Sequence, residues 1–308
     1  MPELPELEVY VEALIARIQG HPLERIDLRH PFLLRTVEPR PAELEGRVVR
    51  DIRRVGKRLA IGLDGGLWLV LHLMLGGRLH WHEPGRAPKG RAHFVLFIFP
   101  TGILTLTEFG TKKRASLHIV RGSEAASAFD RGGVEILDAE LESFRRVLTS
   151  RNHTLKRALT DPALFSGIGN AYSDEILHRA RLSPVALSQR LSDGETERLY
   201  RAARELLREW IIRVRDEAGG EFPKEVNASR SAMAVHGRYG QPCRDCGVPV
   251  QRIRYAESET NYCACCQTDG RLLADRSLSR LLKKDWPRTL EELEERTMSS
   301  SVRLAGGR

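Results

Sequence analysis

Two pairs of cysteines constrain the fold of this chain more than any other feature. Cys243 and Cys246 form one C-x2-C pair, Cys263 and Cys266 form the second, and 16 residues separate the pairs. Each pair can turn tightly enough to aim two thiolates at one ion, and this separation is typical of four-cysteine zinc sites. Because four thiolates complete a tetrahedral shell, the sequence predicts one structural zinc ion. Chance spacing and a redox role are the alternatives.

The residues around the pairs bear on the same prediction. All five cysteines lie in this segment, which in a reducing compartment favours metal binding over disulfides. The fifth, Cys265, is an alternative ligand whose spacing fits less well. Gly247 suits a tight turn after Cys246, and a hairpin is expected between the pairs. Arg252 and Arg254 lie in that hairpin, where their guanidinium groups can meet phosphates.

The hydrophobic pattern divides the rest of the chain into a strand-rich part and a helical part. Apolar residues recur at helical spacing over residues 9–18, before Gly20. Over residues 48–120 the apolar runs are short and separated by turn residues, which predicts an antiparallel sandwich or barrel. Over residues 138–216 apolar residues recur at i, i+3 or i+4, which predicts several helices.

Two segments near the C-terminus have less regular patterns. Gly219 and Gly220 open a polar stretch to residue 231 that is expected to be a linker. After the cysteines, the apolar residues at 278, 281, 282, 286 and 290 fit one short amphipathic element. The last ten residues are expected to be disordered.

Composition narrows the class of protein. A chain of 308 residues exceeds the size at which single cores stop growing, about 250 residues, so two or three domains are expected. The formal charge of +8 favours a polyanionic partner such as nucleic acid, although many basic proteins bind none. No apolar run is long enough to span a membrane, and acids stand where a secretory signal has cations. We therefore expect an intracellular, cytoplasmic protein.

The first residues, MPELPELE, allow two interpretations. Proline and acids are ordinary at a helix start, because the missing N–H is not needed there and carboxylates complement the positive end of the dipole. Alternatively, removal of Met1 makes Pro2 an N-terminal secondary amine, which is a nucleophile. This segment alone does not decide between the two.

A second segment, SGIGN at residues 166–170, lies between two helical patterns. Its glycines allow close approach of another chain, and the N-terminus of the next helix offers N–H groups to an anion. Asn170 adds a side-chain donor, and Lys156 on the preceding helix adds charge. These residues predict a docking point for a nucleic-acid backbone, with a plain interhelical turn as the alternative.

Four segments, MPELPELE, VGKRLAI, LFSGIGNAYSDEIL and VHGRYGQPC…YCACCQ, occur in the order found in one family. In this the chain resembles the formamidopyrimidine-DNA glycosylase and endonuclease VIII family over residues 1–268. The resemblance implies a multi-domain α+β fold. Its expected parts are an N-terminal antiparallel β-sandwich with the opening helix, a helix–two-turn–helix domain, and a C-terminal zinc-ribbon finger. Damaged DNA is the expected partner, bound between the domains.

The resemblance also implies roles for individual residues. Pro2, exposed by removal of Met1, attacks C1′ of the damaged nucleotide, and Glu3 donates and accepts protons at the sugar. An N-terminal amine has a pKa of about 7.7–8.0, so an appreciable fraction is neutral at working pH. Glu6 is expected to organise the amine or the helix start. Lys57, in a turn between strands, matches a lysine that touches the lesion phosphate; a solvated turn lysine is the alternative.

Other positions match the family less closely. His72 corresponds to a phosphate contact, with a buried core histidine as the alternative. In the loop after it, Leu75 stands at the position of an apolar wedge that fills the gap left by a flipped base, with Met74 one step early. Lys112 and Arg114 stand near the place of the family's opposite-strand arginine and phenylalanine.

Two departures from the family pattern stand out. Phe109 and Gly110 look like the family's Phe-Gly pair, but strand spacing places Lys112 to Arg114 nearer the equivalent position. Ser258 stands five residues before the third cysteine, where the family usually has a phosphate-binding arginine. We expect Arg252 or Arg254 to compensate, or the substrate to be more flexible.

Together these features predict a DNA glycosylase and apurinic/apyrimidinic lyase of base-excision repair. The expected enzyme is a monomer that acts on oxidised or ring-opened bases, or on abasic sites. A non-catalytic protein that binds damaged DNA is one alternative, and a structural zinc-ribbon partner protein is another. The expected segments are a catalytic β-sandwich at 1–133, a helix–two-turn–helix domain at 134–231, a zinc finger at 232–270 and an extension at 271–308.

Overall fold

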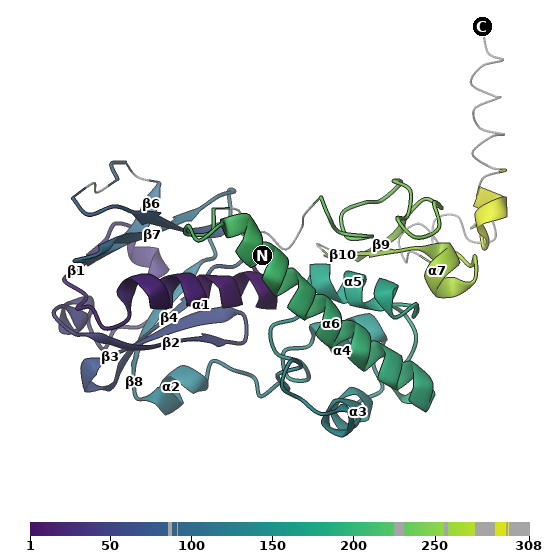
Figure 1. Ribbon diagram of the computed structural model, residues 1–308, viewed down its shortest axis with the longest axis horizontal. Helices are drawn as coiled ribbons and strands as arrows, with labels where there is room; N and C mark the ends of the chain where they lie inside the picture. The colour runs from purple at the N-terminus through teal and green to yellow at the C-terminus, as the bar shows by residue number, and fades with distance from the viewer. Residues whose placement is uncertain are drawn as a thin grey trace, which may run out of the picture. The chain divides into compact units, whose positions relative to one another are not determined.

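The computed structural model divides the chain into two compact units. It describes residues 1–85, 88–90, 92–224, 231–255, 258–274, 287–293 and 295. The first unit comprises Met1–Leu137, Pro162–Ile168 and Leu207–Ala228, and the second comprises Asp138–Asp161, Gly169–Leu206 and Ser229–Arg308. Figure 1 labels their helices and strands. Within the described residues, no helix is long and apolar enough to cross a membrane.

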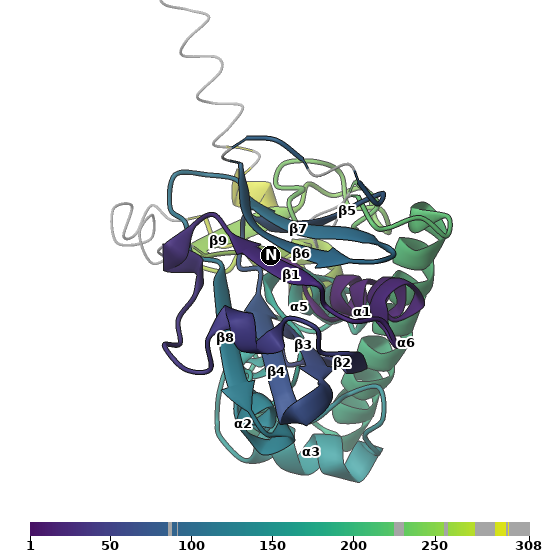
Figure 2. The same ribbon diagram turned by 90° about the vertical axis from the view of Figure 1, so that its left-hand side faces the viewer.

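The first unit contains two four-stranded antiparallel sheets. One has the order β1 (Arg25–Leu28), β6 (His93–Phe99), β7 (Gly102–Glu108), β5 (Gly77–His82). The other has the order β2 (Val49–Val55), β3 (Arg58–Leu63), β4 (Leu67–His72), β8 (Ser116–Arg121). Figure 2 shows the two sheets as separate layers. The predicted β-sandwich is confirmed.

Alternation along the strands builds the core of this sandwich. Leu59 and Ile61 of β3 lie opposite Leu71 and Leu69 of β4, and all four belong to one buried cluster. The same cluster contains alternate residues of the other sheet, such as Phe97 of β6. Residues of the opposite parity in β3 and β4 face α2 (Ser123–Ser127) in a smaller cluster. Period-two burial therefore fixes which face of each strand points inward.

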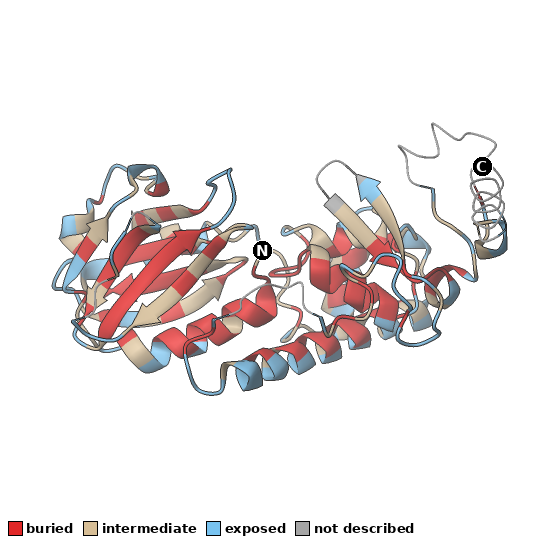
Figure 3. Cartoon of the chain, turned by 90° about the horizontal axis from the view of Figure 1, so that it is seen from above, coloured by how far each residue is buried: buried red, intermediate tan, exposed pale blue. Residues whose placement is uncertain are grey.

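Helix α1 (Leu4–Ile18) belongs to the same core. Leu7, Tyr10, Leu14 and Ile18 follow helical spacing and lie in the cluster shared with both sheets. Most residues of this helix are buried, and they are coloured red in Figure 3. The helix ends before Gly20, whose φ of +82° suits a residue without a side chain. The helix predicted from the sequence is confirmed.

The second unit contains the predicted helices and the cysteine segment. The helices are α3 (Leu141–Thr149), α4 (Leu155–Thr160), α5 (Asn170–Arg179) and the first part of α6 (Asp193–Ala218). The expected hairpin between the cysteine pairs is formed by β9 (Gln251–Tyr255) and β10 (Ser258–Tyr262), and α7 (Ala264–Thr268) follows it. A short 3-10 helix of this unit lies at Ser188–Arg190, and three others lie in the first unit, at Pro31–Leu33, Pro41–Leu44 and Asp64–Gly66.

The stretch after α6 corrects the linker prediction. The chain returns to the first unit at Leu207, within α6, and Gly219 and Gly220, with φ of +58° and +80°, follow the helix in that unit. Phe222 is buried, with its ring centroid 5.5 Å from that of Tyr10 and 6.4 Å from that of Trp81. Phe222 and Pro223 therefore anchor this stretch to the first unit, although the residues around them are polar and exposed. Residues 225–230 of the expected linker lie outside the described residues.

Most of the expected C-terminal element also lies outside the described residues. Of its apolar positions only Leu290 is described, and its N–H donates to the Gly270 carbonyl at 3.3 Å. The last ten residues are not among those described. The linear domain boundaries stay a prediction.

Candidate active site

The N-terminal segment forms the start of α1. Glu3 is the N-cap residue, and the Glu6 carboxylate accepts a hydrogen bond from the Glu3 backbone N–H at 2.9 Å. Pro5 lies in the first turn, where no intrahelical donor is needed. Both carboxylate side chains are buried. The expected role of Glu6 at the helix start is confirmed, and it places Pro2 directly before a buried pair of acids.

The surroundings of the terminus favour a neutral amine. Burial lowers the pKa of the Met1 amino group below its ordinary value of 8.0, and Arg78 and Lys57 act in the same direction. Glu3 and Glu6 act against these effects. Removal of Met1 would make the Pro2 nitrogen, one residue further along this segment, the terminal amine.

Lys57 lies where the sequence predicted it. Gly56, with φ of +60°, and Lys57 form the turn between β2 and β3. The Gly56 carbonyl accepts a hydrogen bond from Arg54 Nη1 at 2.9 Å, which fixes the turn. Lys57 also belongs to the groups whose charge bears on the terminal amine. The charges of Glu3 and Lys57 thus both act on the amine that directly precedes Pro2.

Arg54 is a residue of this site that the sequence analysis missed. Its buried guanidinium bonds to Glu8 on α1, with Nε to Oε1 at 2.6 Å, and to Glu135. Its Nη1 also donates to Ser166 Oγ at 3.2 Å. Next to Ser166, the Gly167 carbonyl accepts the Leu4 N–H at 3.0 Å. Arg54 therefore holds together the start of α1, the Lys57 turn and the first part of the SGIGN segment.

The glycine of that segment is required by close packing. Gly167 has φ of +77°, and a Cβ at this position would lie 2.8 Å from Leu4 Cβ. Both the backbone conformation and the contact exclude a larger residue.

The signal for Arg54 was available in the sequence only as an arginine inside an otherwise ordinary strand, next to the Lys57 turn.

His72 is the last residue of β4. Burial lowers its pKa to about 4, with further contributions from the positive charges of Arg58 and Lys57 and from His118. The imidazole is therefore neutral near pH 7, so it can offer an N–H to a phosphate but no positive charge. The structure supports a neutral hydrogen-bond donor at this position.

The loop after His72 presents an exposed apolar side chain. Met74 has φ of +53°, and Leu75 is 64% exposed. Phe109, at the end of β7, is 69% exposed, and its N–H donates to the Gly76 carbonyl at 3.0 Å. A Cβ on Gly76 would lie 2.3 Å from the Phe109 carbonyl oxygen. Leu75 and Phe109 therefore stand on two loops that touch.

The segment after Phe109 is shaped by a buried acid. The Glu108 carboxylate accepts the backbone N–H groups of Arg114 at 2.7 Å and Ala115 at 3.1 Å. Lys113 turns back, with Nζ 2.5 Å from the Glu108 carbonyl and 5.5 Å from the Phe94 ring centroid. Lys112 and Arg114 are exposed. Phe109 lies beside the loop that carries Leu75, and the roles predicted for Lys112 and Arg114 stay a prediction.

In the second unit, Asn170 and Lys156 belong to one polar network. Asn170 begins α5, and its Nδ2 donates to the Glu259 carbonyl at 2.7 Å. Lys156 Nζ lies 2.5 Å from Asp174 Oδ1 and donates to the Asn170 carbonyl at 2.7 Å. Because the Lys156 side chain is only 13% exposed and pairs with a buried acid, it supports Asn170 more directly than it offers charge to solvent.

Asp174 and Glu175 extend this network to the cysteine segment, a role the sequence analysis missed. Asp174 Oδ2 pairs with His236 Nδ1 at 2.7 Å and accepts the Asn261 N–H at 3.1 Å. The Glu175 carboxylate accepts three consecutive backbone N–H groups, those of residues 234–236, at 2.7–2.9 Å. The acids of the SDEIL segment therefore hold the loop that precedes Cys243.

The four cysteines fit a tetrahedral metal ion. Their sulfur atoms all lie within 4.8 Å of one another, with Cys243 and Cys266 at 4.0 Å and Cys246 and Cys263 at 3.4 Å. A tetrahedral ion with Zn–S bonds of ~2.3 Å needs sulfurs ~3.8 Å apart. Gly247, with φ of +78°, closes the first turn as expected.

The chemistry of these thiols points the same way. Burial raises the pKa of Cys263 to about 12; Cys246 and Cys243 act in the same direction, and Cys266 acts against it. Four crowded thiolates are therefore unfavourable without a cation, and a bound divalent ion would remove that penalty. Cys265 is exposed and stands outside the group of four.

The hairpin arginines have a partner of their own. Arg252 Nη1 and Arg254 Nε lie 3.5 Å and 3.9 Å from the Glu259 carboxylate. The Arg252 guanidinium also lies 4.0 Å from the Tyr239 ring centroid. Ser258 begins β10. The hairpin thus presents two arginines close to Glu259, whose carbonyl binds Asn170.

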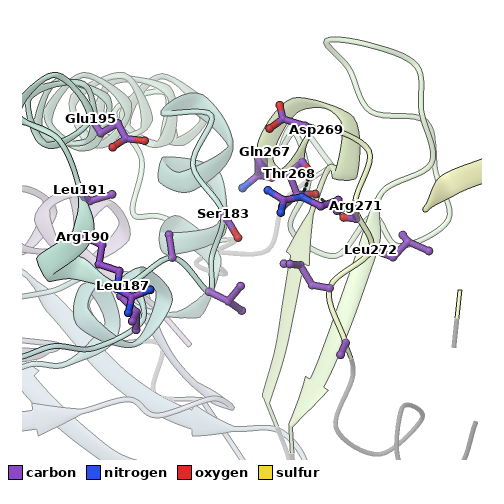
Figure 4. Close-up of a pocket in the computed structure, with 14 residues that line it drawn as sticks. Ser183, Leu187, Arg190, Leu191, Glu195, Gln267, Thr268, Asp269, Arg271 and Leu272 are labelled. Atoms are coloured by element: carbon purple, nitrogen blue, oxygen red, sulfur yellow. Dashed lines mark hydrogen bonds between the residues drawn. The ribbon is translucent and has the colours of Figure 1, made fainter. Parts of the chain in front are cut away.

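A pocket of about 760 Å³ in the second unit is separate from these residues. In Figure 4, Ser183, Leu187 and Arg190 line one side, and Thr268 and Arg271 line the other. The Thr268 hydroxyl donates to the Arg271 carbonyl at 2.6 Å. None of the residues that the sequence singled out lines this pocket, so it has no part in the proposed chemistry.

Comparison with known proteins places the chain in a family. Residues 1–109 match the formamidopyrimidine-DNA glycosylase N-terminal domain, and residues 134–218 match the formamidopyrimidine-DNA glycosylase H2TH domain. The formamidopyrimidine-DNA glycosylase of Heliobacterium modesticaldum is 34% identical over 280 residues, which cover 87% of this chain and 100% of that protein. The chain belongs to the formamidopyrimidine-DNA glycosylase family.

Other members of the formamidopyrimidine-DNA glycosylase family agree with this assignment. The enzyme of Thermus thermophilus is 35% identical over 288 residues, covering 88% of this chain and 100% of that protein. The Lactococcus lactis Fpg, solved with DNA that contains an abasic site, has a TM-score of 0.76 and 26% identity. That alignment covers 86% of this chain and 99% of the other. The fold implied by the resemblance is confirmed.

Proposed function

We propose that this protein is a DNA glycosylase of base-excision repair that also cleaves DNA at abasic sites. The observation that carries the proposal is the amino terminus: a proline precedes a helix start whose two acids are buried, and burial lowers the pKa of the Met1 amine directly before that proline. A protein that only bound damage would have no need of a secondary amine in such surroundings. Membership of the family supports the same conclusion.

In the proposed reaction, Pro2 acts as the nucleophile. Its nitrogen lone pair forms a bond to C1′, the glycosidic bond breaks, and the base leaves with the bonding electrons and a proton. The Pro2 nitrogen then loses its proton, and the C1′–O4′ bond breaks as Glu3 protonates O4′, which opens the sugar ring and gives an iminium ion. This ion acidifies the adjacent C2′, and loss of that proton expels the 3′ phosphate. Glu3 supplies and accepts protons at the sugar, and Lys57 holds the phosphate of the damaged nucleotide.

The DNA-binding residues fall into groups with different tasks. His72 and Asn170 donate hydrogen bonds to phosphates, and Arg252 and Arg254 add charge-assisted contacts. The gap left by the extruded nucleotide is filled by Leu75, with Phe109 from the touching loop, because both are exposed and apolar. Lys112 and Arg114 neutralise phosphates nearby. The substrate class is DNA with an oxidised or ring-opened base, or with a bare abasic site.

The metal held by the four cysteines is proposed to be zinc, one per chain. Cys243, Cys246, Cys263 and Cys266 match its preferred ligand type, number and spacing. When bound, zinc supplies a structural crosslink that orders the β9–β10 hairpin and takes no part in the reaction. Elemental analysis of the purified protein tests this: one equivalent of zinc is expected, and none would contradict it.

The enzyme is tested by cleavage of an oligonucleotide with a single abasic site. The protein that begins at Pro2 is expected to nick this strand, whereas a variant that retains one extra residue before Pro2 binds the same DNA but does not nick it. Equal nicking by both would exclude the amine as nucleophile. Binding without nicking by the trimmed protein would favour the non-catalytic alternative.

A further inference from the structure

One buried histidine has no part in the proposed chemistry. His178 lies in the last turn of α5 and is 3% exposed. Its Nε2 lies 3.3 Å from the sulfur of Cys243 and 4.0 Å from Oδ2 of Asp245. Both residues belong to the first cysteine turn, so this imidazole points from a helix of the DNA-binding domain at one ligand of the proposed metal.

The direction of this hydrogen bond follows from the chemistry of the ligand. A cysteine bound to a divalent metal is a thiolate, which accepts hydrogen bonds and has no proton to give. The Asp245 carboxylate, 4.0 Å away, lies beyond hydrogen-bond distance and has no proton to give either. Since the thiolate can only accept, Nε2 carries the hydrogen of this bond when the metal is bound.

A hydrogen-bond donor at this position would offset the excess negative charge of the metal site. Four thiolates around a divalent ion leave two net negative charges, and Asp245 adds a third nearby. N–H groups directed at the sulfurs spread this charge; the Cys266 N–H, for example, lies 3.4 Å from the Cys263 sulfur. Cys243 is buried, and His178 gives it a hydrogen bond from outside the cysteine segment.

We propose that His178 is a positioning residue for the metal, donating its Nε2–H to the Cys243 thiolate and tying the end of α5 to the first cysteine turn. The proposal rests on the metal site proposed above, but it does not depend on the glycosylase reaction. Since Asn170 begins the same helix, the bond gives the metal a direct mechanical connection to a phosphate-binding residue. Partners that orient ligands commonly change metal affinity 10- to 100-fold when removed.

The test uses the full-length protein loaded with cobalt(II), whose thiolate charge-transfer bands report on the sulfurs. His178→Phe removes the donor and keeps a ring of similar size; the bands are expected to shift to lower energy. Transfer of zinc from this variant to a chromophoric chelator is expected to be about 10-fold faster. His178→Gln places an amide N–H near the position of Nε2 and is expected to restore both values.

Two further variants make the outcome decisive. His153→Phe changes a histidine of the same unit that lies outside the cysteine group and is expected to leave bands and transfer unchanged. His178→Asn is too short to reach Cys243 and is expected to behave like the Phe variant, which keeps the test valid if that variant does not fold. Unchanged charge-transfer bands and an unchanged zinc-transfer rate in both His178→Phe and His178→Asn would overturn the proposal while leaving the metal site intact. A wild-type protein that binds no metal would overturn both.

Discussion

At the scale of single residues, the amino terminus shows how surroundings set reactivity. An amine is a nucleophile only when it is neutral, and burial together with Arg78 and Lys57 lowers the pKa of the terminal amine in this fold. Glu3 and Glu6 partly oppose this, but their carboxylates also fix the helix start that positions the terminus. The same few side chains therefore place the nucleophile and prepare it.

The pH dependence of imine formation tests this arrangement. A lowered pKa means that the neutral amine is already abundant at a lower pH, so single-turnover imine formation should rise with pH and level off earlier than for an unfolded peptide that begins with proline. Arg78→Met removes one of the cations that lower the pKa, so its profile should move to higher pH. A wild-type profile identical to that of the peptide would contradict the account.

The lowered pKa of His72 leads to a prediction about how stability depends on pH. Its pKa is about 4 in the fold and 6.5 ordinarily, so the unfolded chain takes up a proton that the folded chain refuses. The contribution of the neutral imidazole is complete above pH 6.5 and is lost as pH falls toward 4. Between pH 7.5 and 5.0 the wild type should lose about 1–2 kcal/mol more unfolding free energy than His72→Gln. Urea unfolding at the two pH values measures this, and equal losses would show that the imidazole is not desolvated.

At the scale of elements, connections between segments matter more than the segments alone. Arg54 joins α1, the Lys57 turn and the SGIGN segment through one buried guanidinium. Removing one partner of a buried ion pair leaves uncompensated charge, which is why such changes cost more than the loss of an exposed pair.

The prediction for this connection is a loss of both stability and activity. Arg54→Gln should lower the free energy of unfolding by about 3 kcal/mol and should slow nicking of abasic DNA at temperatures where the variant is folded. The matched control is Arg50→Gln, because Arg50 pairs with Asp64 on the surface, where solvent screens the pair and its loss should change the free energy of unfolding far less. Equal effects from both variants, measured by urea unfolding, would refute the proposed role.

The two touching loops make a separate prediction. If Leu75 and Phe109 fill the gap left by the extruded nucleotide, replacing either with Ala removes about 1–2 kcal/mol of apolar contact and slows excision from duplex DNA roughly 10-fold. Excision from the single strand, where no gap is left, should change little. Phe32→Ala is the control, because Phe32 is also an exposed phenylalanine of the first unit. A similar loss on both forms of DNA would argue against a wedge.

The elements themselves were largely predictable from the sequence, whereas these connections were not. Period-two and helical spacing located the sandwich and the helices, because burial on one face imposes those periods locally. The cysteine spacing located the group of four thiols, because each C-x2-C pair lies within a single turn of the chain. Arg54, Asp174 and Phe222 look ordinary in the sequence, since their importance depends on partners up to about two hundred positions away. Phe109 was named but set aside, because counting along a strand could not show that its loop touches Gly76.

At the scale of the whole molecule, the chemistry is distributed along the chain. The proposed nucleophile, the two acids and the proposed wedge belong to the first unit, and Asn170, the hairpin arginines and the four cysteines belong to the second. The formal charge of +8 suits a polyanionic substrate. The proposed reaction depends above all on the nitrogen of Pro2, which must bond to a sugar carbon of damaged DNA.

The measurement that tests this claim most directly is borohydride reduction of the protein during reaction with an abasic-site oligonucleotide. Reduction converts the iminium into a stable bond, and mass spectrometry of the digested adduct identifies the attached residue. The sugar is expected on the peptide that begins with Pro2. An adduct on Lys57 or another lysine, or no adduct from trimmed protein that binds the DNA, would contradict it.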